Sequence, residues 1–251
     1  MDPWHFIFLS LFSICKTTSK GKKMGINYLE KQYLHNSLFE NEECLEINYL
    51  PLNILHREQE LIMLSKIFIK LIEKPFLFSR KVLIQGAIGI GKTLITKKFG
   101  EMLLKSAKKR AIRLYSIHVN CRIEKTNFKI VHRILTEIGY PIPKRGFSPQ
   151  EMIGILHEYL INKKIYILVV LDELNYLQSQ DFDLIYSLTR LNEINNNDLN
   201  YLSLITIVRD ITLLGELDKS TISTLQGNIL TLKRYKKGQI YDILQQRVAL
   251  S

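Results

Sequence analysis

The chain has little cysteine. Only Cys15, Cys44 and Cys121 occur among its 251 residues, and no two of them have the spacing of a metal-ligand pair. Three isolated cysteines also cannot build the dense disulfide framework that stabilises small secreted domains. The sequence therefore favours a protein of the reducing cytosol over a disulfide-rich or zinc-stabilised module.

The sequence also lacks an apolar run of the roughly 20 residues that a transmembrane helix needs. Residues 6–15 form a shorter run, and Asp2 stands where a secretory signal carries positive charge. Two explanations of residues 1–23 stay open. We favour a mis-assigned, non-native N-terminal extension, with normal sequence from Met24, over an anchor at a membrane surface. We expect no membrane partner.

Acidic residues are the minority among the charged ones. The chain has 24 Asp and Glu against 35 Lys and Arg, which leaves a formal net charge of +11. This balance suits a polyanion, either nucleic acid or an anionic membrane, although basic proteins without such a partner also occur. With 46% hydrophobic residues and no internal repeat, the sequence is typical of a globular protein with one large or two smaller domains.

A glycine-rich stretch follows the apolar run 82–84 and precedes a helical pattern. It has the G-x-x-x-x-G-K-[ST] spacing of a phosphate-binding loop. Glycines let backbone N–H groups converge on an anion, and the following helix directs its positive end to the same phosphates. Lys92 can reach the β- and γ-phosphates, and the Thr93 hydroxyl can ligate Mg²⁺. The predicted nucleotide-binding residues are Gly86, Ala87, Ile88, Gly89, Ile90, Gly91, Lys92 and Thr93.

A second motif supports this site. Residues 165–171 form an apolar strand pattern that ends in Asp172 and Glu173. Two carboxylates after a buried strand are the usual companion of a phosphate-binding loop. Asp172 would hold Mg²⁺, and Glu173 would polarise the attacking water as a general base. Lys92 and Glu173 are thus the predicted catalytic residues, and Thr93 and Asp172 the predicted metal ligands.

Apolar periodicity predicts an α/β fold in which strands alternate with helices. One helix begins near Glu58 and stops before Pro75, and Ser148 with Glu151 forms the capping box of another. An apolar stripe over residues 128–138 should pack on the core. Strands are expected at 82–84, 113–119, 165–171, 204–208 and 229–232, with a last helix over 237–248. This order predicts a five-stranded parallel sheet in a three-layer α/β sandwich.

Together these residues resemble the AAA+ initiator ATPases of archaea, relatives of the eukaryotic origin-recognition and cell-division-control loading proteins. The resemblance covers about residues 36–251. The triplet Asn120-Cys121-Arg122 and the lid pattern near the end make it more specific than a phosphate-binding loop alone. The stretches that carry it are 49–51, 56–58, 120–122, 171–177, 184–190 and 235–247.

The resemblance implies an AAA+ nucleotide-binding domain over residues 24–235, followed by the first helix of an α-helical lid over 236–251. It implies ATP or ADP with Mg²⁺ as cofactors, and a part in nucleotide binding for Pro51, His56 and Arg57. It further implies ATP-gated binding of origin DNA and recruitment of the replicative helicase or other initiator subunits, in the cytoplasm at the nucleoid.

Family members also carry a helical element after the second strand that touches DNA, here about residues 126–145. Lys144 and Arg145 are the candidates for contact with the backbone of double-stranded DNA. Because the basic balance supplies phosphate contacts without a recognition helix, we expect weak and largely sequence-independent DNA binding.

Three departures from the family pattern bear on turnover. Arg209 stands where the family has a polar sensor, typically Asn, and no arginine occurs between positions 210 and 233, where the family offers one to a neighbouring subunit. The sequence also ends one helix into the lid, before the second sensor arginine and the winged helix. We therefore expect a truncated or eroded initiator with very slow or absent hydrolysis. The alternatives are a P-loop signalling or regulatory ATPase and a non-catalytic nucleotide-binding remnant.

Overall fold

The computed structural model describes residues 29, 40–46, 48–177, 181–191, 199–210, 222, 225 and 227–251. The chain divides into two units, one of residues 1–42 with Ser251 and one of Glu43–Leu250. In the first unit, Leu29 is helical, and Glu42 is the first residue of the short helix η1 (Glu42–Leu45). The second unit carries the sheet and the candidate site. The predicted N-terminal extension, residues 1–23, lies outside the described residues.

The second unit is built on a five-stranded sheet in the order β2-β3-β4-β1-β5, and every pair of neighbouring strands is parallel. The predicted five-stranded parallel sheet is confirmed. The strands begin and end within two residues of their predicted bounds. They are β1 (Lys81–Gln85), β2 (Leu114–Asn120), β3 (Tyr166–Asp172), β4 (Leu202–Val208) and β5 (Ile229–Thr231).

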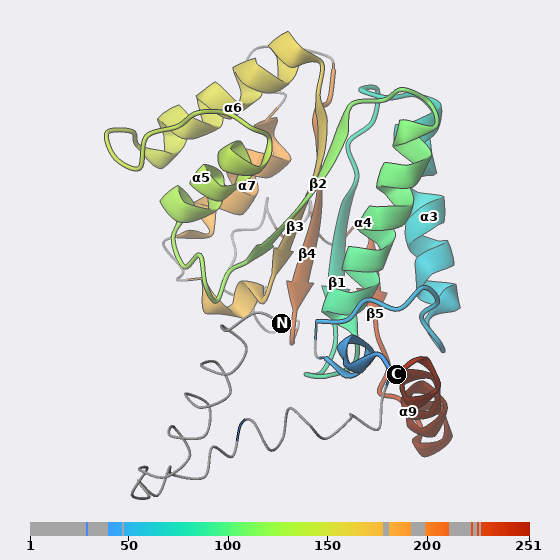
Figure 1. Cartoon of the computed structure of the whole chain (residues 1–251). Coiled ribbons are helices and arrows are strands. Elements are labelled where there is room, and N and C mark those ends of the chain that lie inside the picture. The colour runs from blue at the N-terminus through green and yellow to red at the C-terminus, as the bar shows by residue number, and fades with distance from the viewer. Residues whose placement is uncertain are drawn as a thin grey trace, which may run out of the picture. The chain divides into compact units, whose positions relative to one another are not determined.

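Helices cover both faces of this sheet, as Figure 1 shows. One face packs against α3 (Glu58–Glu73) and α4 (Lys92–Lys108), and the other against α5 (Asn127–Glu137), α6 (Pro149–Lys163) and α7 (Asp183–Thr189). The short η2 (Leu174–Tyr176) follows β3, and α9 (Lys237–Leu250) follows β5. The structure is therefore the predicted three-layer α/β sandwich.

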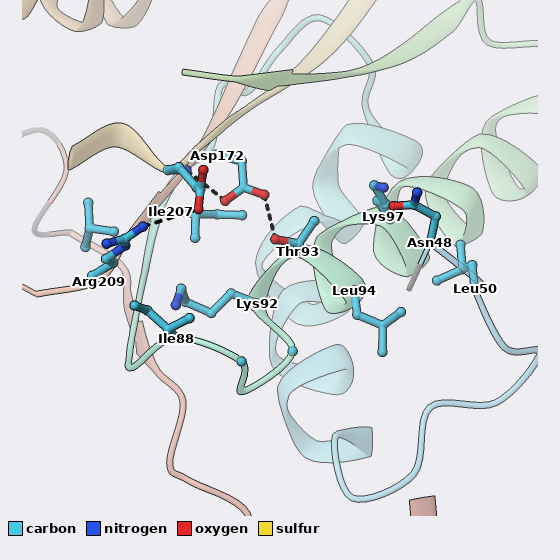
Figure 2. Close-up of a pocket in the computed structure, with 14 residues that line it drawn as sticks. Asn48, Leu50, Ile88, Lys92, Thr93, Leu94, Lys97, Asp172, Ile207 and Arg209 are labelled. Atoms are coloured by element: carbon cyan, nitrogen blue, oxygen red, sulfur yellow. Dashed lines mark hydrogen bonds and ion pairs between the residues drawn. The ribbon is translucent and has the colours of Figure 1, made fainter. Parts of the chain in front are cut away.

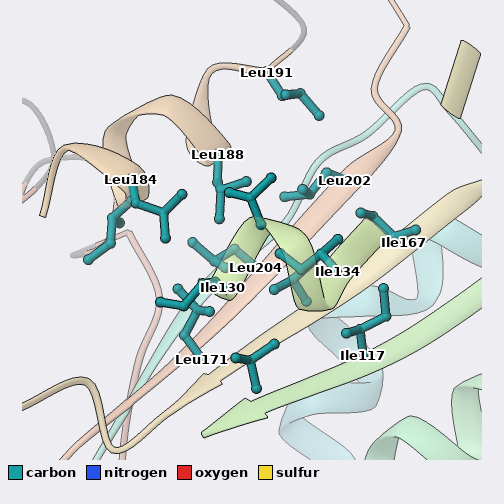
Figure 3. Close-up of a cluster of buried hydrophobic side chains, with 14 of the residues drawn as sticks. Ile117, Ile130, Ile134, Ile167, Leu171, Leu184, Leu188, Leu191, Leu202 and Leu204 are labelled. Atoms are coloured by element: carbon teal, nitrogen blue, oxygen red, sulfur yellow. The ribbon is translucent and has the colours of Figure 1, made fainter. Parts of the chain in front are cut away.

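The two hydrophobic clusters follow from the alternation of side chains along the strands. All seven residues of β3 and of β4 are buried, as expected for central parallel strands covered on both faces. On one face, Ile167 and Leu204 pack with Ile130 and Ile134 of α5 and with Leu188 of α7 (Figure 3). The predicted stripe over residues 128–138 is therefore core, since its apolar residues are buried or packed against this cluster.

Local signals place the helix ends. The Ser148 hydroxyl accepts a hydrogen bond from the Glu151 backbone N–H, and the Glu151 carboxylate accepts one from the Ser148 N–H, so the predicted capping box is present. Helix α3 ends at Glu73, two residues before Pro75. Within the described part of the chain, the helices are too short or too polar to cross a membrane.

Candidate nucleotide-binding site

The site lies at the carboxyl edge of the sheet, where three neighbouring strands end. Strand β4 lies between β3 and β1, and the register pairs Leu171 with Thr206 and Gln85 with Val208. Three segments therefore come together at this edge. Residues 86–93 follow β1, and the pair Asp172-Glu173 ends and follows β3. Arg209 follows β4 and so lies between the other two segments. Crevices at this edge of open α/β sheets are where ligands bind.

Two glycines give the loop after β1 its path. Gly91 has φ of +89° as the N-cap of α4, and Gly86 has φ of +150°. A Cβ on Gly86 would lie 2.9 Å from the Leu232 carbonyl oxygen, and one on Gly91 would lie 3.1 Å from the Tyr235 hydroxyl. Side chains at these positions would therefore push the loop away from the strand end and from residue 235.

Lys92 opens α4 and turns its ammonium back over the loop. Its Nζ donates hydrogen bonds to the carbonyl oxygens of Gly86 (2.6 Å) and Ala87 (2.7 Å). Burial lowers the pKa of this ammonium below its ordinary value, and the carboxylate of Asp172 opposes that effect only in part. The cation is thus held where an anion in the loop would meet it.

Thr93 and Asp172 are in direct contact. The Thr93 hydroxyl donates to Asp172 Oδ2 at 2.6 Å, and His118 Nε2 lies 3.0 Å from the same oxygen. Burial by itself would raise the pKa of the Asp172 carboxyl, but the hydrogen bonds from His118 and Thr93 outweigh it and hold that pKa below its ordinary value. Asp172 is therefore an anion although only 3% of its surface is exposed.

Glu173 has an unusual backbone and a cationic neighbour. Its φ of +55° lies in the left-handed region, which costs energy for a residue with a Cβ. Its backbone N–H donates to Asp172 Oδ1 at 2.8 Å. An Arg209 guanidinium nitrogen lies 3.5 Å from Glu173 Oε1 and donates to the Tyr176 hydroxyl at 2.7 Å. The predicted general base is thus held in an ion pair.

These groups line one cavity of about 420 Å³. Figure 2 shows Lys92, Thr93 and Asp172 in its middle, with Arg209 at one end and Asn48 at the other. Of the predicted loop residues, Ile88, Gly89, Gly91, Lys92 and Thr93 contribute to the wall. Ile90 is buried behind the loop, whereas Gly86 and Ala87 act through the carbonyls that hold Lys92.

Residues 80–208, just over half of the chain, match the family model of the AAA domain. The chain belongs to the AAA domain family. The chain is 36% identical over 223 residues to ORC1-type DNA replication protein 2 of Sulfolobus acidocaldarius, a match that covers 88% of this chain and 54% of that protein. The predicted resemblance to archaeal initiator ATPases is therefore confirmed.

Two solved structures are similar to this chain over most of its length. The Aeropyrum pernix ORC2 protein in ADPNP-ADP complexes has a TM-score of 0.77 at 26% identity, covering 85% of this chain and 57% of that one. The Aeropyrum pernix ORC1 protein in complex with DNA has a TM-score of 0.74 at 26% identity, covering 84% and 53%. The chain thus spans about half the length of the relatives that it matches.

Pro51, His56 and Arg57, which the resemblance assigned a part in nucleotide binding, do not line the main cavity. Pro51 is buried, and its carbonyl accepts a hydrogen bond from Lys98 at 3.0 Å. His56 and Arg57 line a separate cavity. Arg57, with 4% of its surface exposed, donates from Nη2 to the Ile90 carbonyl at 3.0 Å. Arg57 therefore supports the phosphate-binding loop from behind.

The triplet after β2 ties the ends of two strands together. The Cys121 backbone N–H donates to the Asp172 carbonyl at 2.9 Å, and Asn120 Oδ1 accepts from the Arg122 N–H at 2.8 Å. The Cys121 side chain is fully buried, and burial raises the pKa of its thiol to about 12. The triplet thus acts as a structural brace for the acidic strand end, with an unreactive thiol.

Some wall residues were not predicted from sequence. Asn48 and Lys97 line the cavity, and His118 lies behind it as a partner of Asp172; each reaches the site from a segment without a motif. For His118 a signal exists, because Ser116, His118 and Asn120 alternate with apolar residues along β2 and so share one face. For Asn48 and Lys97 nothing in the local sequence points to the cavity.

Proposed function

We propose that this AAA domain binds ATP or ADP together with Mg²⁺ in the cavity beside residues 86–93. The observation that carries the proposal is the 2.6 Å contact between the Thr93 hydroxyl and the Asp172 carboxylate. It joins the hydroxyl after the loop lysine to the carboxylate that ends β3, on the wall of a cavity that also holds Lys92. Phosphate-binding loop proteins gather these three groups around a nucleotide and its metal.

The donor set fits Mg²⁺, because hydroxyl and carboxylate oxygens are the protein ligands that this ion prefers. When bound, Mg²⁺ neutralises charge on the phosphates. The backbone N–H groups of residues 86–93 would bind phosphate oxygens at the positive end of α4. Lys92 would exchange the Gly86 and Ala87 carbonyls for the β- and γ-phosphates, and Glu173 would orient and deprotonate the attacking water.

We further propose that this nucleotide site belongs to a DNA replication initiator that binds origin DNA and recruits the replicative helicase or other initiator subunits. The archaeal relatives named ORC1-type DNA replication proteins support this role. Lys144 and Arg145 support it too, because both are exposed in the loop between α5 and α6 and are free to meet a phosphate backbone. A protein with this role acts at the nucleoid.

Hydrolysis by this domain is proposed to be slow. Arg209 takes the place at the end of β4 where the family has a neutral polar residue, and no arginine stands between positions 210 and 233. An arginine supplied to the transferred phosphoryl group is worth roughly 10³–10⁵ in rate. The second candidate function is nucleotide binding without turnover. The ion pair of Arg209 with Glu173 favours it, because it engages the general base.

Calorimetric titration with ATP and Mg²⁺ tests the binding proposal. Lys92→Ala removes the loop cation and should weaken ATP binding at least tenfold, about 1.4 kcal/mol. The matched control is Lys66→Ala, which removes an exposed cation from α3 and should leave the Kd unchanged. Equal affinities of the unchanged chain and Lys92→Ala would refute a phosphate-binding role for this loop.

A further inference from the structure

We propose that the connection between β5 and α9 is a second surface for the phosphate backbone of a nucleic acid. It carries Lys233, Arg234 and Lys236, which line a cavity of about 520 Å³ beside α3. Strand β5 forms one edge of the sheet, and β2, which α5 follows, forms the other (Figure 1). The surface is therefore separate from the basic residues near α5. The inference rests on the proposed DNA binding and adds a second place of contact to it.

The three cations are not used within the fold. Their side chains are exposed and form no hydrogen bond or ion pair with another described residue. Glu58 and Glu60 line the opposite wall of the cavity, and both are engaged by other groups. Glu60 pairs with Arg57 at 2.8 Å, and Glu58 accepts a hydrogen bond from the His56 backbone N–H at 3.2 Å. The positive charge of the connection is thus available to an external anion.

The backbone that carries these cations is held in place. The buried Arg57 donates from Nη2 to the Lys233 carbonyl at 2.7 Å and from Nε to the Tyr235 hydroxyl at 3.0 Å. At the end of the connection, the Lys236 N–H donates to Gln239 Oε1 at 2.9 Å. Binding of an anion therefore orders only the exposed side chains, which keeps the entropic cost of binding small.

The arrangement of the charges fits a row of phosphates better than one small anion. An extended chain reaches about 3.3 Å per residue, so positions 233 and 236 are separated by at most about 10 Å. A duplex carries one negative charge per roughly 1.7 Å of its axis, so several phosphates can meet cations spread over this length. Helix α9 begins at Lys237, directly after the cluster, and its positive end adds to the same field.

The surface offers little that could read bases or anchor a peptide. Tyr235 is the one aromatic residue between positions 232 and 237, and the Arg57 guanidinium carbon lies 4.1 Å from the centre of its ring. That face of the ring is therefore closed to a stacking base. Among the described residues that line the cavity, only Met63 and Leu230 are apolar, and Leu230 is buried. The contacts that remain are with phosphates, independent of sequence.

Fluorescence anisotropy of the full chain with a labelled duplex, measured across a salt series, tests this surface. The triple variant Lys233→Ala, Arg234→Ala, Lys236→Ala should make the slope of log K against log salt shallower by about 2.7, because each lost phosphate contact removes about 0.9. The melting temperature should stay unchanged, since these side chains hold nothing in the fold. The charge-conserving variant Lys233→Arg with Lys236→Arg should keep the slope.

The matched control removes three exposed lysines, Lys105, Lys109 and Lys163, which line neither basic cavity. It should change the slope far less. Equal slopes for the two triple variants would overturn this inference and leave DNA binding near α5 intact. If the first triple variant loses affinity for poly-glutamate but not for the duplex, the surface serves an acidic protein and the inference is wrong. Failure of the unchanged chain to bind any duplex would overturn the proposed DNA binding, and this inference with it.

Discussion

Arg209 changes what the end of β4 can do for catalysis. A neutral amide at this position would align water by hydrogen bonds without binding the general base. The guanidinium instead lies 3.5 Å from Glu173 and shares the cavity with Lys92. Two cations that line one cavity favour tight binding of a triphosphate ground state, which does not by itself accelerate the chemical step.

With Arg209 at the end of β4, we predict slow ATP hydrolysis. Single-turnover assays with radiolabelled ATP should show hydrolysis over hours or not at all, because Lys92 and the metal ion carry the stabilisation of the transition state that an additional arginine would share. Glu173→Gln should abolish any residual rate. Hydrolysis within minutes by the unchanged chain, lost in Glu173→Gln, would show a working ATPase instead.

Residues that follow one another in sequence were the predictable part of the site. Residues 86–93 and the pair Asp172-Glu173 belong to motifs whose spacing fixes their place at a sheet edge. His118 reaches the site through space from the neighbouring strand β2. Arg57 was named through the family resemblance, but it supports the loop from behind and does not line the cavity. Both placements depend on how distant segments pack together, which local sequence patterns do not contain.

Helix α9 holds the segment that forms the far end of the cavity. Its Arg247 donates from Nη1 to the carbonyls of Cys44 at 2.7 Å and Glu46 at 3.2 Å, and its guanidinium carbon lies 4.9 Å from the Tyr49 ring centre. Asn48, which lines the cavity, lies between these anchor points. The helix therefore positions the wall opposite Arg209.

Loss of this anchor should weaken ATP binding without affecting the phosphate end. Arg247→Ala should raise the Kd for ATP about tenfold, whereas the Kd for inorganic tripolyphosphate should not change, because residues 86–93 stay intact. Calorimetric titration of both ligands measures the difference. Gln245→Ala, an exposed change on the same helix, is the control. Parallel loss of both affinities would mean that α9 acts on the whole domain rather than on this wall.

The elements themselves followed closely from local signals, and their small errors have a physical reason. The capping box at Ser148 and the stop before Pro75 both act within one helical turn, so sequence reads them directly. Strand ends depend on the neighbouring strand. Asn120 and Asp172 pair across β2 and β3, so both strands extend to residues that look like loop in the sequence. Because Asn120 and Asp172 are polar, the sequence pattern ended both strands one residue too early.

The whole molecule carries an excess of positive charge, +11, that the nucleotide site does not account for. Part of it gathers near α5. Lys129, Arg133 and Lys144 line a surface cavity with His132 and Glu124, and Arg145 is exposed beside it. The apolar side of α5 is buried in the core, so its basic side is presented to solvent from a fixed support. Such a surface suits the phosphates of DNA better than its bases.

We therefore predict DNA binding that is weak, strongly dependent on salt and largely independent of sequence. Each phosphate contact releases a condensed counterion, so removing two contacts with Lys144→Ala and Arg145→Ala should make the slope of log K against log salt shallower by about 1.8. Fluorescence anisotropy with a labelled duplex, measured across a salt series, gives that slope. The charge-matched control Lys66→Ala with Lys163→Ala should reduce it far less, since these exposed lysines lie on α3 and α6 and do not line the basic cavity at α5. Equal slopes for the two double variants would remove Lys144 and Arg145 from the interface. A marked preference for one duplex that persists at high salt would mean that the domain reads bases, which backbone contacts cannot do.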